Sequence, residues 1–159
     1  MKVSSQSTGT RRRGAAKAVF TIGYEGRTVA ELVTTLQASG VEQLIDVRHN
    51  ALSRKKGFSK SALSSACEQG GIAYVHVKEL GIPSSLRKNL DSPAAYERLF
   101  TVYANELLPA AKSFVELATD LVQERTSALL CFERAATCCH RGHLASEVSR
   151  ATGYNVQHL

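Results

Sequence analysis

Five polar residues with the chemistry of an anion-binding or proton-transfer site lie at or shortly after the ends of short apolar runs: Asp46, Arg48, Glu133, His140 and Arg141. Guanidinium groups bind phosphate or carboxylate through two parallel hydrogen bonds, whereas carboxylates and imidazoles transfer protons near neutral pH. We therefore predict that Arg48 and Arg141 bind an anionic ligand. Asp46, Glu133 and His140 are the candidates for catalytic residues.

Three more residues are predicted to bind the substrate around this set. Tyr24 ends the first apolar run, and His158 lies near the end of the last one. Arg54 belongs to a basic loop that continues with Lys55 and Lys56. All three are polar groups able to hydrogen-bond an anionic ligand.

Each of these predictions has a structural alternative. Asp46 and Arg48 form an internal ion pair in that alternative, because ion-pair networks also stabilise folds. His140 is then a capping or core histidine, and Tyr24 is a core residue with a hydrogen-bonded hydroxyl group. The sequence leaves these alternatives open.

The cysteines fit none of the sharper chemical motifs. A cysteine-based phosphate-binding loop needs Arg six residues after the cysteine, and Cys131, Cys138 and Cys139 all lack it. Cys138, Cys139, His140 and His143 are crowded together, but structural zinc sites use spaced pairs such as CxxC. A nucleophilic Cys139 is disfavoured because adjacent side chains usually point apart and nothing indicates a lowered thiol pKa. With no P-loop and no GxGxxG motif either, we expect neither a metal nor a cofactor.

The apolar runs alternate with helical patterns, which is typical of an α/β fold with a mostly parallel sheet. Sheets of this kind bind ligands at the carboxyl ends of their strands. We predict a single domain with about five strands and helices on both faces of the sheet. The expected strands are 19–24, 44–48, 73–77, 128–132 and 154–158.

Capping residues mark several of the expected helix ends. Thr28 and Glu31 form a capping-box pattern, and Ser59 is the expected N-cap of the next helix. A last helix is expected over 143–151.

Prolines and aromatic residues shape the expected helices in the middle of the chain. Pro93 suits the first turn of a helix, whereas Pro109 is expected to break or kink a later stretch. Tyr96, Phe100 and Tyr103 have helical spacing. We therefore predict that this stripe packs against the core and does not stack on bases.

Positive charge is concentrated at the N-terminal end of the chain. The 159 residues carry a formal net charge of +6, of which residues 1–18 contribute +5. This segment is rich in Ser, Thr, Gly and Arg, so we predict a disordered basic tail over 1–18 and an α/β domain over 19–159. The tail is expected either to be solvated or to contact nucleic acid.

The sequence also bears on where the protein is found. No apolar run reaches the roughly 18 residues of a membrane span, and the first residues lack the apolar core of an export signal. The four cysteines match no disulfide framework for a chain of this size, which favours reduced thiols. We expect a cytoplasmic protein with no membrane partner.

Seven short motifs occur in a fixed order along the chain. They are Thr21-Ile22-Gly23-Tyr24, Asp46-Val47-Arg48, Gly57-Phe58-Ser59, Leu80-Gly81, Cys131-Phe132-Glu133, Cys139-His140-Arg141 and His158. In this order they resemble the family called domain of unknown function 488 (DUF488), over residues 19–159. The family has no settled activity, so the resemblance implies a shared site and leaves the reaction open.

Two classes of function fit these residues. In the first, the protein is an enzyme acting on a phosphate-bearing or nucleotide-like substrate, with Glu133 or Asp46 as general acid or base and His140 as proton shuttle. In the second, it is a non-catalytic module that binds nucleic acid or a nucleotide through the basic loop and the tail. The sequence does not determine whether the protein is an enzyme, nor its oligomeric state.

Overall fold

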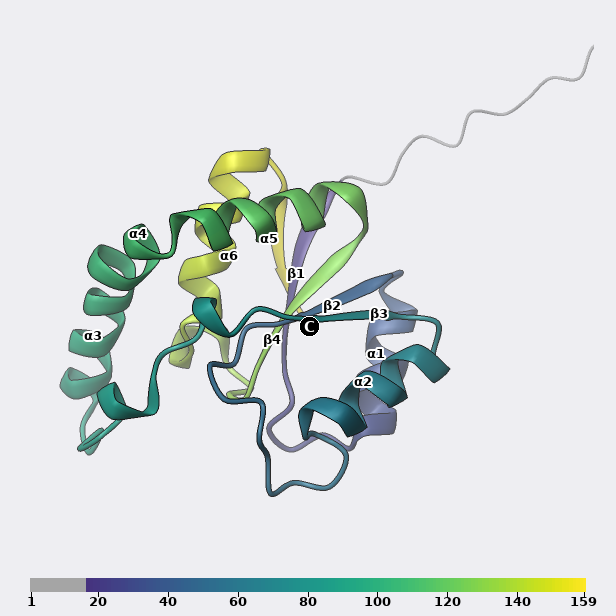
Figure 1. Ribbon diagram of the computed structural model, residues 1–159, viewed down its shortest axis with the longest axis horizontal. Helices are drawn as coiled ribbons and strands as arrows, with labels where there is room; N and C mark the ends of the chain where they lie inside the picture. The colour runs from purple at the N-terminus through teal and green to yellow at the C-terminus, as the bar shows by residue number, and fades with distance from the viewer. Residues whose placement is uncertain (1–16) are drawn as a thin grey trace, which may run out of the picture.

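Five strands pair in one all-parallel sheet, as a computed structural model of the protein shows for residues 17–159 (Figure 1). The order across the sheet is β3-β2-β4-β1-β5. The predicted single α/β domain with a parallel sheet of about five strands is confirmed. The strands are β1 (Ala18–Gly23), β2 (Gln43–Asp46), β3 (Ala73–His76), β4 (Ser127–Cys131) and β5 (Asn155–His158). The predicted tail lies outside the described residues except for its last two, and Ala18 already belongs to β1.

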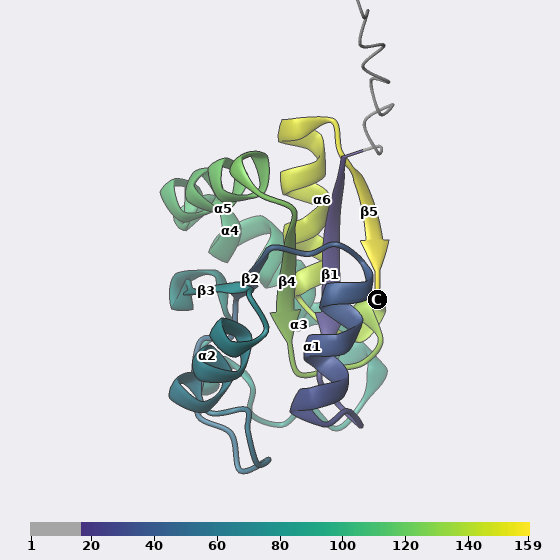
Figure 2. The ribbon, with the colours of Figure 1, turned by 90° about the vertical axis from the view of Figure 1, so that its right-hand side faces the viewer.

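Helices cover both faces of the sheet, as predicted (Figure 2). On one face, α1 (Val29–Ala38) and α2 (Lys60–Gln69) bury Leu32, Leu36 and Leu63 against the sheet. The other face is covered by α3 (Pro93–Val102), α4 (Leu108–Ala110), α5 (Lys112–Glu124) and α6 (Arg141–Thr152). The sheet has apolar side chains on both faces, which explains why β1 and β4 are largely apolar along their length.

The chain leaves the inner strands in two directions. After β1 and β2 it continues into the helices of one face, whereas after β4 it continues into α6 on the other face. Because β4 lies between β1 and β2, the loops that follow these three strands diverge at the carboxyl edge of the sheet. Such divergence leaves room for a ligand in parallel α/β sheets.

Local signals explain most of the helix ends. Thr28 and Glu31 form the predicted capping box, with both hydrogen bonds present. Ser59 occupies the N-cap position of α2, but its side chain makes no capping hydrogen bond. The last helix begins at Arg141, two residues earlier than predicted.

The region around Pro109 differs in detail from the prediction. A π-helical turn, η3 (Tyr103–Leu107), leads into α4, and Pro109 lies in the first turn of α4, where its missing N–H is tolerated. The break falls at Ala111, the residue between α4 and α5. Three short 3₁₀ turns complete the elements, namely η1 (Lys78–Leu80), η2 (Ser84–Leu86) and η4 (Ala136–Cys138).

The backbone of β1 closely approaches the loop that follows β4. A Cβ atom on Gly23 would overlap the carbonyl oxygen of Glu133 and contact the Cα of Arg134. Both neighbours are backbone atoms, so they cannot move as a flexible side chain would. The glycine is needed here for close packing.

We expect Gly23→Ala to lower the free energy of unfolding by about 1–3 kcal/mol, the usual cost of overpacking. Urea denaturation of the variant and the wild type measures this difference. Gly142→Ala is the comparison and should cost less, because its added Cβ would approach Ala136 O at a tight 3.0 Å, against an overlap with Glu133 O at Gly23, and because alanine favours the helix. Equal stability of Gly23→Ala and the wild type would contradict the close approach.

No helix in residues 17–159 is both long and apolar enough to cross a membrane.

Candidate functional site

The residues predicted to form one polar site lie in two networks at the carboxyl edge of the sheet. Arg48 contacts both Tyr24 and Asp46 on the side covered by α1 and α2. His140 lies on the side covered by α6, where its ring packs against Tyr103 with centroids 5.1 Å apart. The backbone between Asp46 and Arg48 joins the two networks.

The first network is a closed ion pair. Arg48 Nε donates to Asp46 Oδ1 at 2.8 Å, and Arg48 Nη2 donates to Asp46 Oδ2 at 2.6 Å. The two side chains are only 6% and 0% exposed. Burial lowers the pKa of Arg48, but its hydrogen bonds to Asp46 and the charge of Asp46 more than reverse this effect. The guanidinium group is therefore held in its charged form.

Other groups complete the hydrogen bonding of this pair. Arg48 Nη1 donates to Tyr24 Oη at 3.2 Å and to the Phe58 carbonyl at 2.8 Å. Asp46 Oδ2 also accepts from Tyr74 Oη at 2.5 Å. The Arg48 fork, which the sequence predicted to bind an anion, is directed at groups of the protein itself.

Arg141 is also directed inward. This side chain is fully buried, and its Nη1 and Nη2 donate to the carbonyl oxygens of Glu133 and Arg134 at 2.5 and 3.0 Å. Its Nε is buried without a hydrogen-bond partner among the described residues. Arg141 thus connects the start of α6 to the loop that follows β4.

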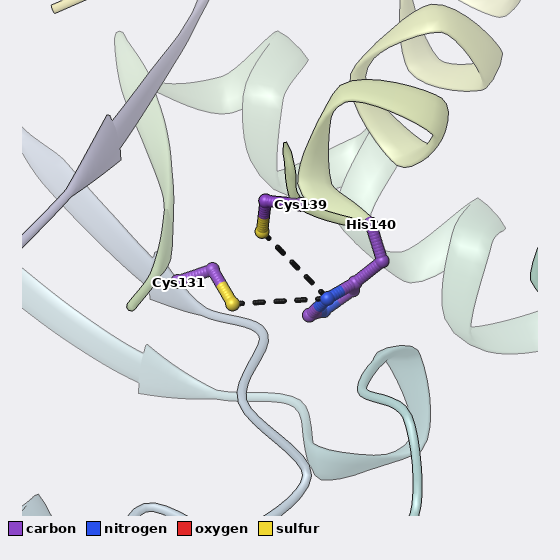
Figure 3. Close-up of side chains that lie close together, drawn as sticks. All are labelled: Cys131, Cys139 and His140. Carbon is purple, nitrogen blue, oxygen red and sulfur yellow. Dashed lines mark hydrogen bonds between the residues drawn. The ribbon is translucent and has the colours of Figure 1, made fainter. Parts of the chain in front are cut away.

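Two thiols and one imidazole form the centre of the second network (Figure 3). Cys131 Sγ and Cys139 Sγ each lie 3.7 Å from His140 Nδ1. All three residues are buried. The strand β4 positions Cys131 at its last residue, whereas Cys139 and His140 come from the turn that enters α6.

The two thiols differ in acidity. A hydrogen bond from Cys139 and the charge of His140 hold the pKa of Cys131 well below its usual range, although burial opposes them. Burial raises the pKa of Cys139, and the neighbouring Cys131 raises it further. When one of the pair ionises, it is therefore Cys131.

Glu133 lies next to this centre and is half-buried. Its Oε2 is 3.4 Å from Cys131 Sγ. Burial raises the pKa of the Glu133 carboxyl group, and the charge of Cys131 adds to this effect. Glu133 is also the one predicted site residue that lines a large pocket at this edge of the sheet.

That pocket has a volume of about 1010 Å³ and lies between α3, the start of α6 and the loops after β1 and β4. Four of its lining residues are acidic, and none is Lys or Arg; the acidic ones are Glu25, Asp91, Glu97 and Glu133. Tyr96 and Phe100 supply aromatic surface, with ring centroids 6.2 Å apart. Tyr96 is 39% exposed, so the prediction that the whole aromatic stripe packs against the core holds for Tyr103 but is wrong for Tyr96.

The remaining predicted residues lie outside both networks or at their margin. Arg54 is exposed in the loop between β2 and α2. His158 lies on the edge strand β5, where its Nδ1 is 2.6 Å from Thr21 Oγ1. The Tyr24 ring stacks on Phe58 with centroids 4.4 Å apart, so this residue is part of the core as well as a partner of Arg48.

The sequence did not predict the role of Cys131. The crowded set weighed for zinc was Cys138, Cys139, His140 and His143, but Cys138 and His143 are exposed and do not join the cluster. Cys131 takes their place although it is eight residues away from Cys139 in sequence. The available signal was the Cys131-Phe132-Glu133 strand end, which combines a thiol and a carboxylate.

A family comparison matches most of the chain. The model described as "Domain of unknown function DUF488" matches residues 28–148. The matched region includes Asp46, Arg48 and the whole segment from Cys131 to Arg141. No curated protein and no solved structure matches the chain.

Proposed function

The chain belongs to the DUF488 family, and we propose that it is an enzyme acting on a nitrogen-bearing aromatic substrate of the nucleobase type. One observation carries the proposal. Glu133 lines a substrate-sized pocket and also contacts Cys131, at 3.4 Å from Sγ. It therefore links the pocket to the buried cluster of Cys131, Cys139 and His140, as expected of a residue that exchanges a proton with a bound substrate.

The chemistry of the pocket supports this class of substrate. Aromatic side chains such as Tyr96 and Phe100 provide flat apolar contacts for a ring. The surrounding carboxylates accept hydrogen bonds from amino groups and favour positive over negative charge. A phosphate group is disfavoured here, since Arg48 and Arg141 donate to groups of the protein itself.

The predicted site residues then take different roles. Glu133 exchanges the proton, and His140, which does not line the pocket, orients the two thiols. Asp46 and Arg48 stabilise the backbone at Val47, whose carbonyl oxygen lies 3.2 Å from His140 Nε2. In this proposal they do not contact the substrate.

Nucleic-acid binding, the second function considered from the sequence, uses a different surface. Arg54 and Lys56 are exposed in the loop before α2, whereas Lys55 Nζ donates to the Tyr24 carbonyl at 3.1 Å. Neither Arg54 nor Lys56 lines the acidic pocket. Substitutions of these two residues therefore test nucleic-acid binding without altering the pocket.

We expect adenosine and cytidine to bind the full-length chain in isothermal titration calorimetry, and inorganic phosphate not to bind. Tyr96→Ala should weaken the binding roughly 5- to 150-fold, because stacking of a base on an aromatic ring contributes about 1–3 kcal/mol. Glu133→Gln should abolish product formation. Product is detected by mass spectrometry after incubation of the protein with each of the two nucleosides. Both side chains are partly exposed, so both variants should stay folded.

The matched control is the double substitution Arg54→Ala and Lys56→Ala. It should leave nucleoside binding unchanged under the proposed function. The opposite result has two parts: the wild type binds a single-stranded oligonucleotide but no nucleoside, and the double variant no longer binds the oligonucleotide. That result would support the nucleic-acid module and reject the enzyme.

A further inference from the structure

We propose that Cys131, Cys139 and His140 bind a divalent transition metal of the zinc class. Two thiolates and one imidazole are ligands that zinc prefers in proteins. The three ligand atoms all lie within 4.8 Å of one another (Figure 3).

The distances within the cluster suit a tetrahedral ion. With Zn–S near 2.3 Å and Zn–N near 2.0–2.1 Å, a tetrahedral angle puts sulfur and nitrogen about 3.6 Å apart. The two observed separations between a sulfur and His140 Nδ1 are both 3.7 Å. Both sulfur–nitrogen separations therefore match a tetrahedral site, and all three ligand atoms lie within 4.8 Å of one another.

The imidazole of His140 is oriented as a metal ligand. Its Nε2 lies 3.2 Å from the carbonyl oxygen of Val47, and a carbonyl oxygen only accepts hydrogen bonds. Nε2 therefore carries a proton, and in the neutral imidazole that a metal ion requires, Nδ1 presents its lone pair to the two sulfurs. Metal-bound histidines use their second nitrogen in this way, donating to a backbone carbonyl or a carboxylate.

The surroundings also suit a bound ion. The three side chains are buried, so a bound ion would be shielded from solvent. The backbone N–H of Arg141 points at Cys139 Sγ at 3.5 Å, as in sites where N–H groups support a thiolate ligand. Tyr103 packs edge-on against the His140 ring and donates from its hydroxyl to Leu80 O, which limits rotation of the ring.

Three protein ligands leave one tetrahedral position free, which is typical of catalytic rather than structural zinc sites. Glu133 contacts the ligand cluster, with Oε2 3.4 Å from Cys131 Sγ. A Cys₂His zinc site with an adjacent, non-ligating Glu is the arrangement by which zinc deaminases activate water. The metal site stands on its own geometry; only this role of Glu133 rests on the proposed function.

The test is the metal content of the full-length chain, produced in zinc-supplemented medium and purified with a reducing agent but without chelator. We expect inductively coupled plasma mass spectrometry to find about one zinc per chain. Replacement of zinc by Co²⁺ should give the intense visible absorption of a tetrahedral thiolate-bound cobalt ion. This spectrum is measured on the wild type, so it does not depend on a variant that folds.

Cys131→Ser and Cys139→Ser should each lower the metal content at least about tenfold. Cys138→Ser and His143→Ala are the matched controls, because these neighbours are exposed and lie outside the cluster. Both controls should keep the metal of the wild type.

Absence of metal and of the cobalt spectrum in the wild type would overturn the inference. So would a disulfide between Cys131 and Cys139 in the isolated chain, or loss of metal in Cys138→Ser equal to that in Cys131→Ser. Glu133→Gln should keep its zinc. Nucleoside binding without metal would reject the metal site alone, whereas metal without nucleoside binding would reject the proposed function alone.

Discussion

Asp46→Ala is expected to lower the free energy of unfolding by about 3–5 kcal/mol, as for other buried ion pairs that lose one partner. The substitution leaves the Arg48 guanidinium group buried with no carboxylate to balance its charge. It also removes the acceptor of the Tyr74 hydroxyl group. Native stability is typically only about 5–15 kcal/mol, so the expected loss is a large fraction of it. Urea denaturation followed by circular dichroism measures the loss.

A double substitution distinguishes the contribution of the ion pair to stability from that of side-chain packing. Asp46→Leu combined with Arg48→Met replaces both charges with apolar groups, which is often tolerated when a pair is removed together. The double variant should therefore be more stable than Asp46→Leu alone. If Asp46→Leu is as stable as the wild type, the pair does not hold this edge of the sheet together.

Arg141→Met should lower the free energy of unfolding by about 3 kcal/mol or more, because each hydrogen bond from a charged group contributes about 1.5–3 kcal/mol. Two such bonds, to the carbonyl oxygens of Glu133 and Arg134, are lost. The stability of Arg141→Lys should lie between that of Arg141→Met and that of the wild type. An ammonium group keeps the charge but cannot reproduce the planar fork of the guanidinium group. Thermal and urea denaturation measure both variants.

Arg150→Met is the matched control on the same helix. The Arg150 side chain is 73% exposed and pairs with Glu147 on the surface. Its replacement should change stability by no more than about 0.5 kcal/mol. An Arg141→Met variant as stable as this control would mean that the Arg141 guanidinium group is free to bind a ligand.

Local patterns were sufficient to predict the elements of this fold. The strands around Ile22 and Leu129 are largely apolar and almost wholly buried, which is typical of strands covered on both faces. The Thr28 capping box is equally local, because both of its hydrogen bonds join residues three apart. Strand order depends on long-range packing, which such patterns do not encode.

The partners of the polar residues were harder to predict for a chemical reason. A guanidinium group binds a phosphate, a carboxylate and a pair of backbone carbonyls through the same geometry. The sequence around Arg141 therefore could not reveal that its partners are the Glu133 and Arg134 carbonyls. Cys131 contacts His140 only because the loop through η4 folds back toward the end of β4, which also brings Cys139 close. The spacing of residues in the sequence does not predict this loop conformation.

The position of β4 in the sheet also governs when this chain becomes able to fold during synthesis. Both neighbours of β1, namely β4 and β5, come from the last third of the chain, and β2 meets β4 across more than 80 intervening residues. Pairing between segments this distant in sequence slows folding, because a long loop must close before the contact forms. A nascent chain that ends before Ser127 has β1 without a partner strand, so its apolar surface stays uncovered. Such chains are prone to aggregation until the segment from Ser127 onward has left the ribosome.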